Sequence, residues 1–192
     1  MNTRTLTRLG MLSAVAFALM FVGEIPVPMI PGAKFDLSEI PTVLAALGMG
    51  PLAGLVVEVL KDLLFLASGK SQAGLVGVAA NLVAGGTLTL AAGFVAHMLG
   101  LRWGATDLKP GQYWLRGAVA VLVGAAAMAG VMFVVNAYVF IPLWIKTPGV
   151  QWAMSAAWLP FNLIKGALAG TFALALHRRA APYLLSVAGR VA

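Results

Sequence analysis

The sequence predicts an all-α integral membrane protein, a bundle of six transmembrane helices that forms one domain over residues 1–192. Of the 192 residues, 61% are hydrophobic and only 10% are charged, whereas soluble chains are typically about 25% charged. The hydrophobic residues form long runs, separated by short breaks that contain proline, glycine or charge. A soluble domain of this size could not bury so much apolar surface, because much of its surface must face water. The composition therefore favours lipid as the surrounding medium.

The first three expected helices are separated by proline and glycine. The first spans about residues 6–23, and we expect it to be retained as a helix rather than removed as a signal peptide. Residues 26–31 contain three prolines, which cannot continue a helix and predict a stiff, extended loop. The second helix, about residues 37–48, is shorter. The third spans about residues 51–67 and has Pro51 at its first position, where proline is favoured.

The last three expected helices are longer. Residues 72–99 contain no Asp, Glu, Lys or Arg, and a run of about 20 apolar residues is enough to cross a bilayer. A polar loop over residues 101–113 separates this helix from the next, which spans about residues 114–144. The sixth helix spans about residues 151–176, and a short basic tail over residues 177–192 follows it.

The basic residues predict the orientation in the membrane. Six helices place both termini on one side, and the positive-inside rule identifies this side as the cytoplasm. The net charge of +7 then reflects topology, and we expect no binding to nucleic acid. Tryptophan is typical of the membrane interface, and Trp144, Trp152 and Trp158 lie near the expected outer ends of the last two helices. Inside segments would contain Arg4, Arg8, Arg102, Lys109, Arg116, Arg178, Arg179 and Arg190, and outside loops Lys34, Lys70 and Lys146.

Polar residues of four helices are expected at a similar depth below the outer surface. Ionisable groups inside a membrane are costly, and they usually face a cavity or a partner. A cavity with apolar walls and a few amides suits a flat small molecule with polar edges. We therefore predict an outward-facing binding site. Its candidate residues are Glu58, Lys61, Asn81, Asn136, Asn162 and Lys165.

Structural roles remain open for some of these residues. Glu58 and Lys61 are three positions apart on one helix and could form a simple ion pair. Asn81 or Asn136 alone could be a hydrogen-bonding contact between helices. The chain has no cysteine, so it has no thiolate metal site, and we expect no bound metal.

The sequence contains no convincing motif for ATP hydrolysis. Residues 69–71 read Gly-Lys-Ser, as at the end of a phosphate-binding loop, but the first glycine of that motif would fall on Leu64. Active transport by this chain would therefore need partner subunits.

Four stretches resemble the substrate-binding S component of energy-coupling factor (ECF) vitamin transporters, in particular the riboflavin-specific type. They occur in the expected order and span nearly the whole chain. The last one is the most specific. They are KFDLSEIP at residues 34–41, LGMGPLAG at 47–54 running into VEVLKDLL at 57–64, VNAYVFIP at 135–142 and PFNLIKG at 160–166.

The resemblance implies a six-helix fold in which the proline-rich first loop covers an outward-facing site. It also implies that side chains matching Asn136, Asn162 and Lys165 form hydrogen bonds to the flavin. An amide offers both a donor and an acceptor, and lysine offers donors only, which suits the mixed polar edge of an isoalloxazine ring. Phe35, Asp36 and Leu37 of the first stretch are further candidate binding residues, and Phe140 and Phe161 could contribute to an aromatic slot.

The resemblance also implies partners. Ala14 and Ala18 form a face of small residues that permits close helix approach, and in this family such a face docks the transmembrane coupling subunit. Ordinary packing inside the bundle is the alternative. Two ATPase subunits would supply the energy, and the complex would lie in the lipid of a bacterial plasma membrane. No cofactor is expected, since riboflavin, or flavin mononucleotide as an open second ligand, would be the transported molecule.

Two other functions remain as alternatives. The chain could be an S component for another vitamin, such as folate, thiamine or pantothenate. It could instead be a small membrane enzyme that uses an acidic residue as acid or base, although we expect no enzymatic activity. The candidate acidic residues are Asp36, Glu39, Glu58 and Asp62.

Overall fold

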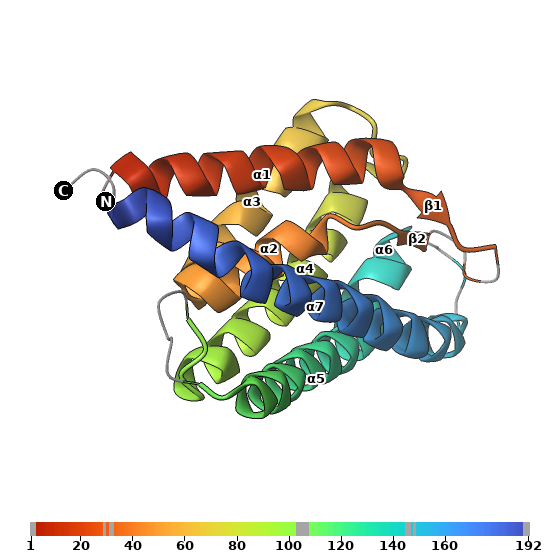
Figure 1. Cartoon of the computed structure of the whole chain (residues 1–192). Coiled ribbons are helices and arrows are strands. Elements are labelled where there is room, and N and C mark those ends of the chain that lie inside the picture. The colour runs from red at the N-terminus through yellow and green to blue at the C-terminus, as the bar shows by residue number, and fades with distance from the viewer. Residues whose placement is uncertain are drawn as a thin grey trace.

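A computed structural model describes residues 3–28, 30, 33–102, 108–144, 147 and 149–189, and for residues 180–189 it describes the backbone only. The described chain is almost entirely helical, with one small hairpin that follows the first helix (Figure 1). The helices are α1 (Thr3–Gly23), α2 (Glu39–Met49), α3 (Pro51–Ala67), α4 (Gly74–Met98), α5 (Pro110–Val135), α6 (Ile141–Trp144) and α7 (Gln151–Gly189). The π-helical turn η1 (Asn136–Phe140) connects α5 and α6, and the strands are β1 (Ile25–Pro26) and β2 (Lys34–Phe35).

Four helices of the described chain are long and apolar enough to cross a membrane. They are Thr3–Gly23, Gly74–Met98, the continuous segment Pro110–Trp144, and Gln151–Arg179. α2 is only 11 residues long, or about 16 Å at 1.5 Å per residue, so it cannot cross a bilayer alone. It packs instead against α1, α3, α4 and α7. The fold is consistent with the predicted six helices, if α5, η1 and α6 are taken as one.

The helix bounds differ most from the prediction at two places. α5 begins at Pro110, four residues earlier than expected, because proline suits the first turn of a helix, and the polar loop is correspondingly shorter. α7 continues to Gly189, so the expected basic tail is helical as far as that residue. Alanine and arginine, which are strong helix formers, occupy positions 178–181. Arg190 and Lys146 of the predicted topology lie outside the described residues.

The segment between α1 and α2 forms an antiparallel hairpin. Ile25 pairs with Phe35, and Pro26 pairs with Lys34. The β1–β2 hairpin lies at the end of α1 that is far from the N-terminus (Figure 1). Of the proline-rich segment, Met29, Pro31 and Gly32 lie outside the described residues.

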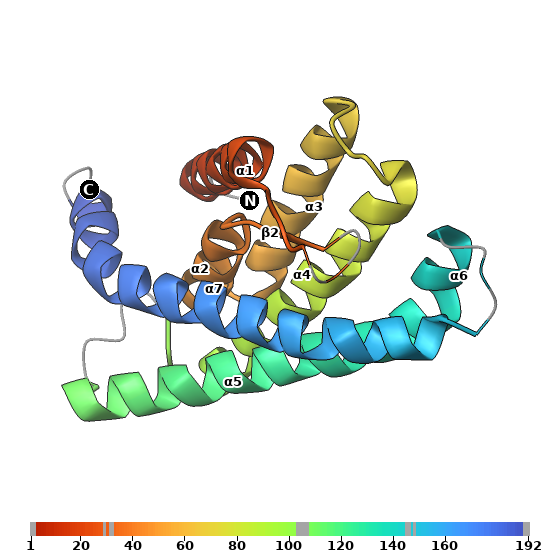
Figure 2. The same cartoon turned by 90° about the vertical axis from the view of Figure 1, so that its right-hand side faces the viewer.

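The helices form two groups that enclose the polar residues. α5 and α7 lie side by side, and α1, α2 and α3 lie together above them, with α4 between the groups (Figure 2). α1 packs on α2 and α3, and its Leu9, Ala16 and Met20 are buried. Ala14 and Ala18 are exposed, so the alternative that their face packs inside the bundle is wrong.

Candidate ligand-binding site

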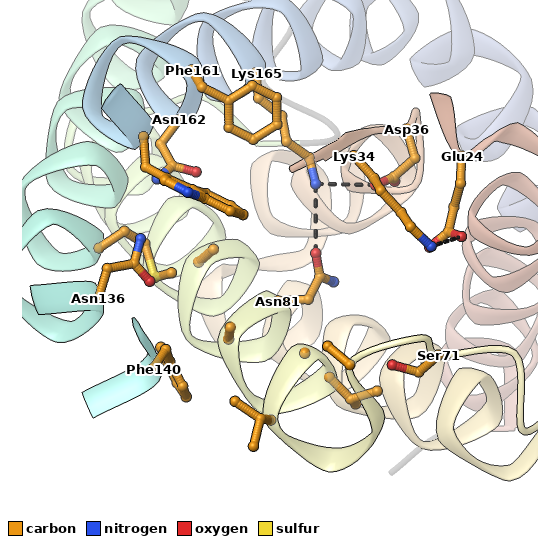
Figure 3. Close-up of a pocket in the computed structure, with 18 of the residues that line it drawn as sticks. Glu24, Lys34, Asp36, Ser71, Asn81, Asn136, Phe140, Phe161, Asn162 and Lys165 are labelled. Carbon is orange, nitrogen blue, oxygen red and sulfur yellow. Dashed lines mark hydrogen bonds and ion pairs between the residues drawn. The ribbon is translucent and has the colours of Figure 1, made fainter. Parts of the chain in front are cut away.

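A cavity of about 190 Å³ lies between the β1–β2 hairpin, α4, the α5–α6 segment (Pro110–Trp144) and α7. Its walls are mostly apolar, and polar side chains reach it from each of these elements. Asn136, Phe140 and Asn162 lie on one side of it, and Glu24 and Lys34 lie on the other (Figure 3). The cavity therefore has an amide end and an ionic end.

The amide end contains buried hydrogen-bond donors. Asn136 opens the π-helical turn η1, and Asn162 lies on α7. Both side chains are buried, with 4% and 2% of their surfaces exposed. The Nδ2 atom of each one, and Nε1 of Trp158, have no hydrogen-bond partner among the described residues. Buried polar groups normally have such a partner, so these three groups are available to a ligand.

The ionic end is centred on Lys165. Its Nζ lies 3.1 Å from Oδ2 of Asp36, 3.5 Å from Oδ1 of Asn81 and 3.7 Å from Oε1 of Glu39. The Lys165 ammonium donates to Asp36 and Asn81, and the Glu39 carboxylate adds a second ion pair. The protein itself therefore provides partners for the charge of Lys165.

Asp36 is held as a carboxylate in the loop before α2. It accepts hydrogen bonds from the backbone N–H and the hydroxyl of Ser38. Burial raises the pKa of Asp36, but the nearby Lys165 and Lys61 ammonium groups and the bonds from Ser38 outweigh burial and lower the pKa to about 2. The loop that carries Asp36 is thus tied to α7 by a charged hydrogen bond.

A second buried lysine lies behind the cavity. Nζ of Lys61 is 2.8 Å from Oε1 of Glu58, 3.1 Å from Oε1 of Glu39 and 3.9 Å from Oδ1 of Asp62. The ion pair between Glu58 and Lys61, which the sequence left open, is confirmed. Glu39 lies between the two lysines, and Asn81 joins the same network by donating to Oδ1 of Asp62 at 3.0 Å.

This network fits only because α4 has a glycine beside it. A Cβ atom at Gly85 would lie 2.1 Å from Oε1 of Glu58 and 2.5 Å from Oε2 of Glu39. Both distances are far below van der Waals contact, so any larger residue would displace the carboxylates.

Within the described residues, no group of three or more His, Cys, Asp or Glu side chains could hold a metal ion.

Of the nine residues predicted to bind the ligand, five line the cavity and four do not. Phe140 and Phe161, which were expected to contribute to an aromatic slot, also line it. Phe35 and Leu37 are outside the lining, and Leu37 is 40% exposed. Side chains alternate along extended chain, so Lys34 and Asp36 face the cavity instead. Glu58 and Lys61 are fully buried behind it. The five predicted residues that line it are Asp36, Asn81, Asn136, Asn162 and Lys165.

Two tryptophans of the lining were not among the predicted binding residues. Trp144 and Trp158 were assigned only to the membrane interface, yet both line the cavity. Trp158 precedes Asn162 by four positions and Lys165 by seven, so all three lie on one face of α7. This spacing was visible in the sequence and could have identified Trp158.

The comparisons with known proteins agree with this architecture. The family described as "ECF transporter, substrate-specific component" matches residues 4–176. The chain is 34% identical over 176 residues to the riboflavin transporter FmnP of Bacillus subtilis (strain 168), covering 86% of each protein. It is 28% identical over 191 residues to the riboflavin transporter RibU of Staphylococcus aureus (strain TCH60), covering 95% of this chain and 93% of that protein.

A solved structure has the same fold. The structure described as "Structure and mechanism of the S component of a bacterial ECF transporter" superposes with a TM-score of 0.71 and 30% identity, covering 94% of this chain and 96% of that one. The family match extends over most of the chain and includes every residue that lines the cavity. The chain therefore belongs to the substrate-specific components of ECF transporters.

Proposed function

We propose that this chain binds riboflavin in the cavity and serves as the riboflavin-specific S component of an ECF transporter. The observation that carries the proposal is the amide end, where Asn136 and Asn162 present buried amides without protein partners beside aromatic side chains. The names of both relatives, which are riboflavin transporters, support the same ligand. The transporter family also argues against the alternative of a small membrane enzyme.

The chemistry of the cavity suits a flavin. The pyrimidine edge of an isoalloxazine carries carbonyl acceptors and an N–H donor, and an asparagine amide can match both kinds of group. Phe140 and Phe161 flank the amides (Figure 3) and offer apolar surface to the fused rings. The ribityl hydroxyls would extend toward Asn81 and Lys165, where charged and amide groups can exchange hydrogen bonds with them.

The β1–β2 hairpin would cover the site. Glu24, Lys34 and Asp36 all line the cavity and belong to this segment or its flanks. Nζ of Lys34 is 2.7 Å from Oε2 of Glu24, and this pair links the two ends of the hairpin. In the proposed orientation the hairpin faces the outside of a bacterial plasma membrane, and both termini are cytoplasmic.

Partners would supply the energy for transport. Ala14 and Ala18 are exposed on α1, and small residues permit another helix to approach closely. We assign this face to the transmembrane coupling subunit, which would recruit two ATPase subunits. The remaining apolar surface of the bundle would contact lipid. Flavin mononucleotide stays open as a second transported ligand.

A titration tests the proposed ligand. Purified protein in detergent should quench the fluorescence of free riboflavin with 1:1 stoichiometry and without ATP. Asn136→Leu should weaken binding about tenfold or more, because a buried hydrogen bond is lost. Thr171→Val is a matched control, since Thr171 is exposed on α7 and donates to the carbonyl of Ala167 outside the cavity. Folded protein that binds folate, thiamine or pantothenate but leaves riboflavin unquenched would refute the proposal.

A further inference from the structure

The donors that line the cavity differ in whether the protein satisfies them. Nζ of Lys34, Nδ2 of Asn81 and Nζ of Lys165 all donate to acceptors of the chain. Nδ2 of Asn136, Nδ2 of Asn162 and Nε1 of Trp158 find none in the part of the chain that the structure describes. All three unsatisfied donors come from the α5–α6 segment and α7. The buried donors of the cavity that have no protein partner therefore lie at its amide end.

Trp158 is the least ambiguous of these donors. A rotation of the side-chain amide exchanges nitrogen and oxygen in asparagine, so Asn136 and Asn162 can each donate or accept. An indole nitrogen can only donate. The buried N–H of Trp158 therefore requires an acceptor, and the described chain does not provide one.

The position of Trp158 is well defined by its neighbours. It lies one turn before Asn162 on the cavity face of α7. Its ring meets the ring of Phe161 edge to face, with centroids 5.6 Å apart and an interplanar angle of 84°. This arrangement is favourable for aromatic pairs and fixes the orientation of the indole.

We propose that Trp158 is a ligand-contacting residue whose indole N–H donates a hydrogen bond to an acceptor on the ring system of the bound flavin. The inference rests on the proposed function. The ring system is the partner because Trp158 lies one turn before Asn162 on α7 and packs on Phe161, which places it at the amide end. Nζ of Lys165, in contrast, pairs with Asp36 at the ionic end. Binding to the ribityl chain would place the flat rings among the ion pairs.

This bond would contribute to specificity. A buried group that can only donate discriminates strongly against a ligand that presents a donor or an apolar group at the same place. Trp158 would thus select for an acceptor on the ring, while Asn136 and Asn162 could adapt to either kind of group.

Two ligands and two variants test the proposal. Trp158→Phe removes the N–H and keeps an aromatic ring. Trp152→Phe is the matched control, because Trp152 is on the same helix, is 47% exposed and contacts Phe133 and Tyr138 rather than the cavity. The probes are riboflavin and lumiflavin, which has the same ring system with a methyl group in place of the ribityl chain. We expect Trp158→Phe to weaken the binding of both probes about tenfold, and Trp152→Phe to change neither.

The binding results distinguish a failure of the inference about Trp158 from a failure of the proposed function. Unchanged affinity of Trp158→Phe for both probes overturns the inference, and so does a loss confined to riboflavin, which would place Trp158 at the ribityl chain. If the unsubstituted protein binds no riboflavin, the proposed function itself fails. Nuclear magnetic resonance of the indole N–H groups provides a second test, in which the protein keeps Trp158. The resonance is first assigned with variants in which each of the other tryptophans is replaced by phenylalanine. The Trp158 N–H resonance should move downfield on addition of riboflavin, and an unmoved resonance overturns the inference.

Discussion

Replacing Lys165 by methionine removes an ammonium group that the protein, rather than a ligand, already satisfies. Its Nζ lies 3.1 Å from a carboxylate oxygen of Asp36 and 3.7 Å from one of Glu39. Both acidic residues are buried, with 4% and 0% of their surfaces exposed. Glu39 keeps Lys61 as a partner at 3.1 Å, but within the described residues no other lysine or arginine forms an ion pair with Asp36.

The expected effect is a loss of stability in the absence of ligand. Removing one partner of a buried ion pair typically costs about 3–5 kcal/mol, because the other charge stays buried without compensation. Methionine keeps most of the length of the side chain, so packing contributes little to this cost. Lys165→Met should therefore lower the free energy of unfolding of ligand-free protein by about 3–5 kcal/mol.

A double variant separates charge from packing. Asp36→Asn combined with Lys165→Met removes both charges, and it should recover most of the stability that Lys165→Met alone loses. The measurement is denaturant unfolding of ligand-free protein in detergent for the wild type, both single variants and the double variant. A cost below about 1 kcal/mol for Lys165→Met, or no recovery in the double variant, would refute the structural role of the pair.

Three further predictions follow from single positions. Ala14→Trp or Ala18→Trp should abolish riboflavin uptake by cells and leave binding intact, because both residues are exposed on α1; lost binding would contradict this. Gly85→Ala should destabilise the protein by about 1–3 kcal/mol, because the new methyl group displaces the Glu58 carboxylate. Gly130→Ala is the control and should not destabilise the protein, since no atom lies within 4 Å of its new Cβ. Equal free energies of unfolding for the two variants would refute the reasoning. Asp36 has a pKa lowered to about 2 from an ordinary value of about 4, so its charge stabilises the fold above about pH 4 and this contribution is lost as the pH falls toward 2. The difference in stability between wild type and Asp36→Asn should be constant from pH 5 to 7 and shrink below pH 4, and a difference that changes between pH 5 and 7 would contradict the assignment.

The sequence predicted the helices well because the signals for them are local. Proline at Pro51 and the break after Ala67 set the bounds of α3, which agree with the prediction. The Glu58–Lys61 pair could also be foreseen, since a spacing of three residues on a helix fixes their proximity. The same local reasoning placed Asn136 and Asn162 at a common depth, and both do line one end of the cavity.

The long-range contacts could not be predicted in this way. Depth along a helix says nothing about which neighbour a side chain faces, so the contact of Lys165 with Asp36, which are 129 positions apart, had no sequence signal. The assignment of Phe35 and Leu37 to the site depended on the register of a short extended segment. A shift of one residue in such a segment exchanges the two faces, and the structure places Lys34 and Asp36 on the cavity side.

The two ends of the cavity are expected to contribute unequally to affinity. At the ionic end, Lys165 already donates to Asp36 and Asn81, so a ligand hydroxyl would replace one hydrogen bond by another. At the amide end, Nδ2 of Asn162 has no partner in the described chain, so a ligand acceptor would form a bond where the unbound protein has none. Satisfying a buried donor is worth more than exchanging its partner.

Asn162→Leu should consequently weaken riboflavin binding more than Lys165→Met does, when both affinities refer to the folded fraction of each variant. Fluorescence titration measures the affinities, and ligand-free unfolding supplies the correction for unfolded protein. Asn162 and Lys165 lie on the same face of α7, so their position in the membrane does not predict which variant loses more affinity. The expected order depends on whether the protein already provides a hydrogen-bond partner for each side chain. A larger corrected loss for Lys165→Met would mean that the ligand displaces Asp36 and takes the ammonium group for itself.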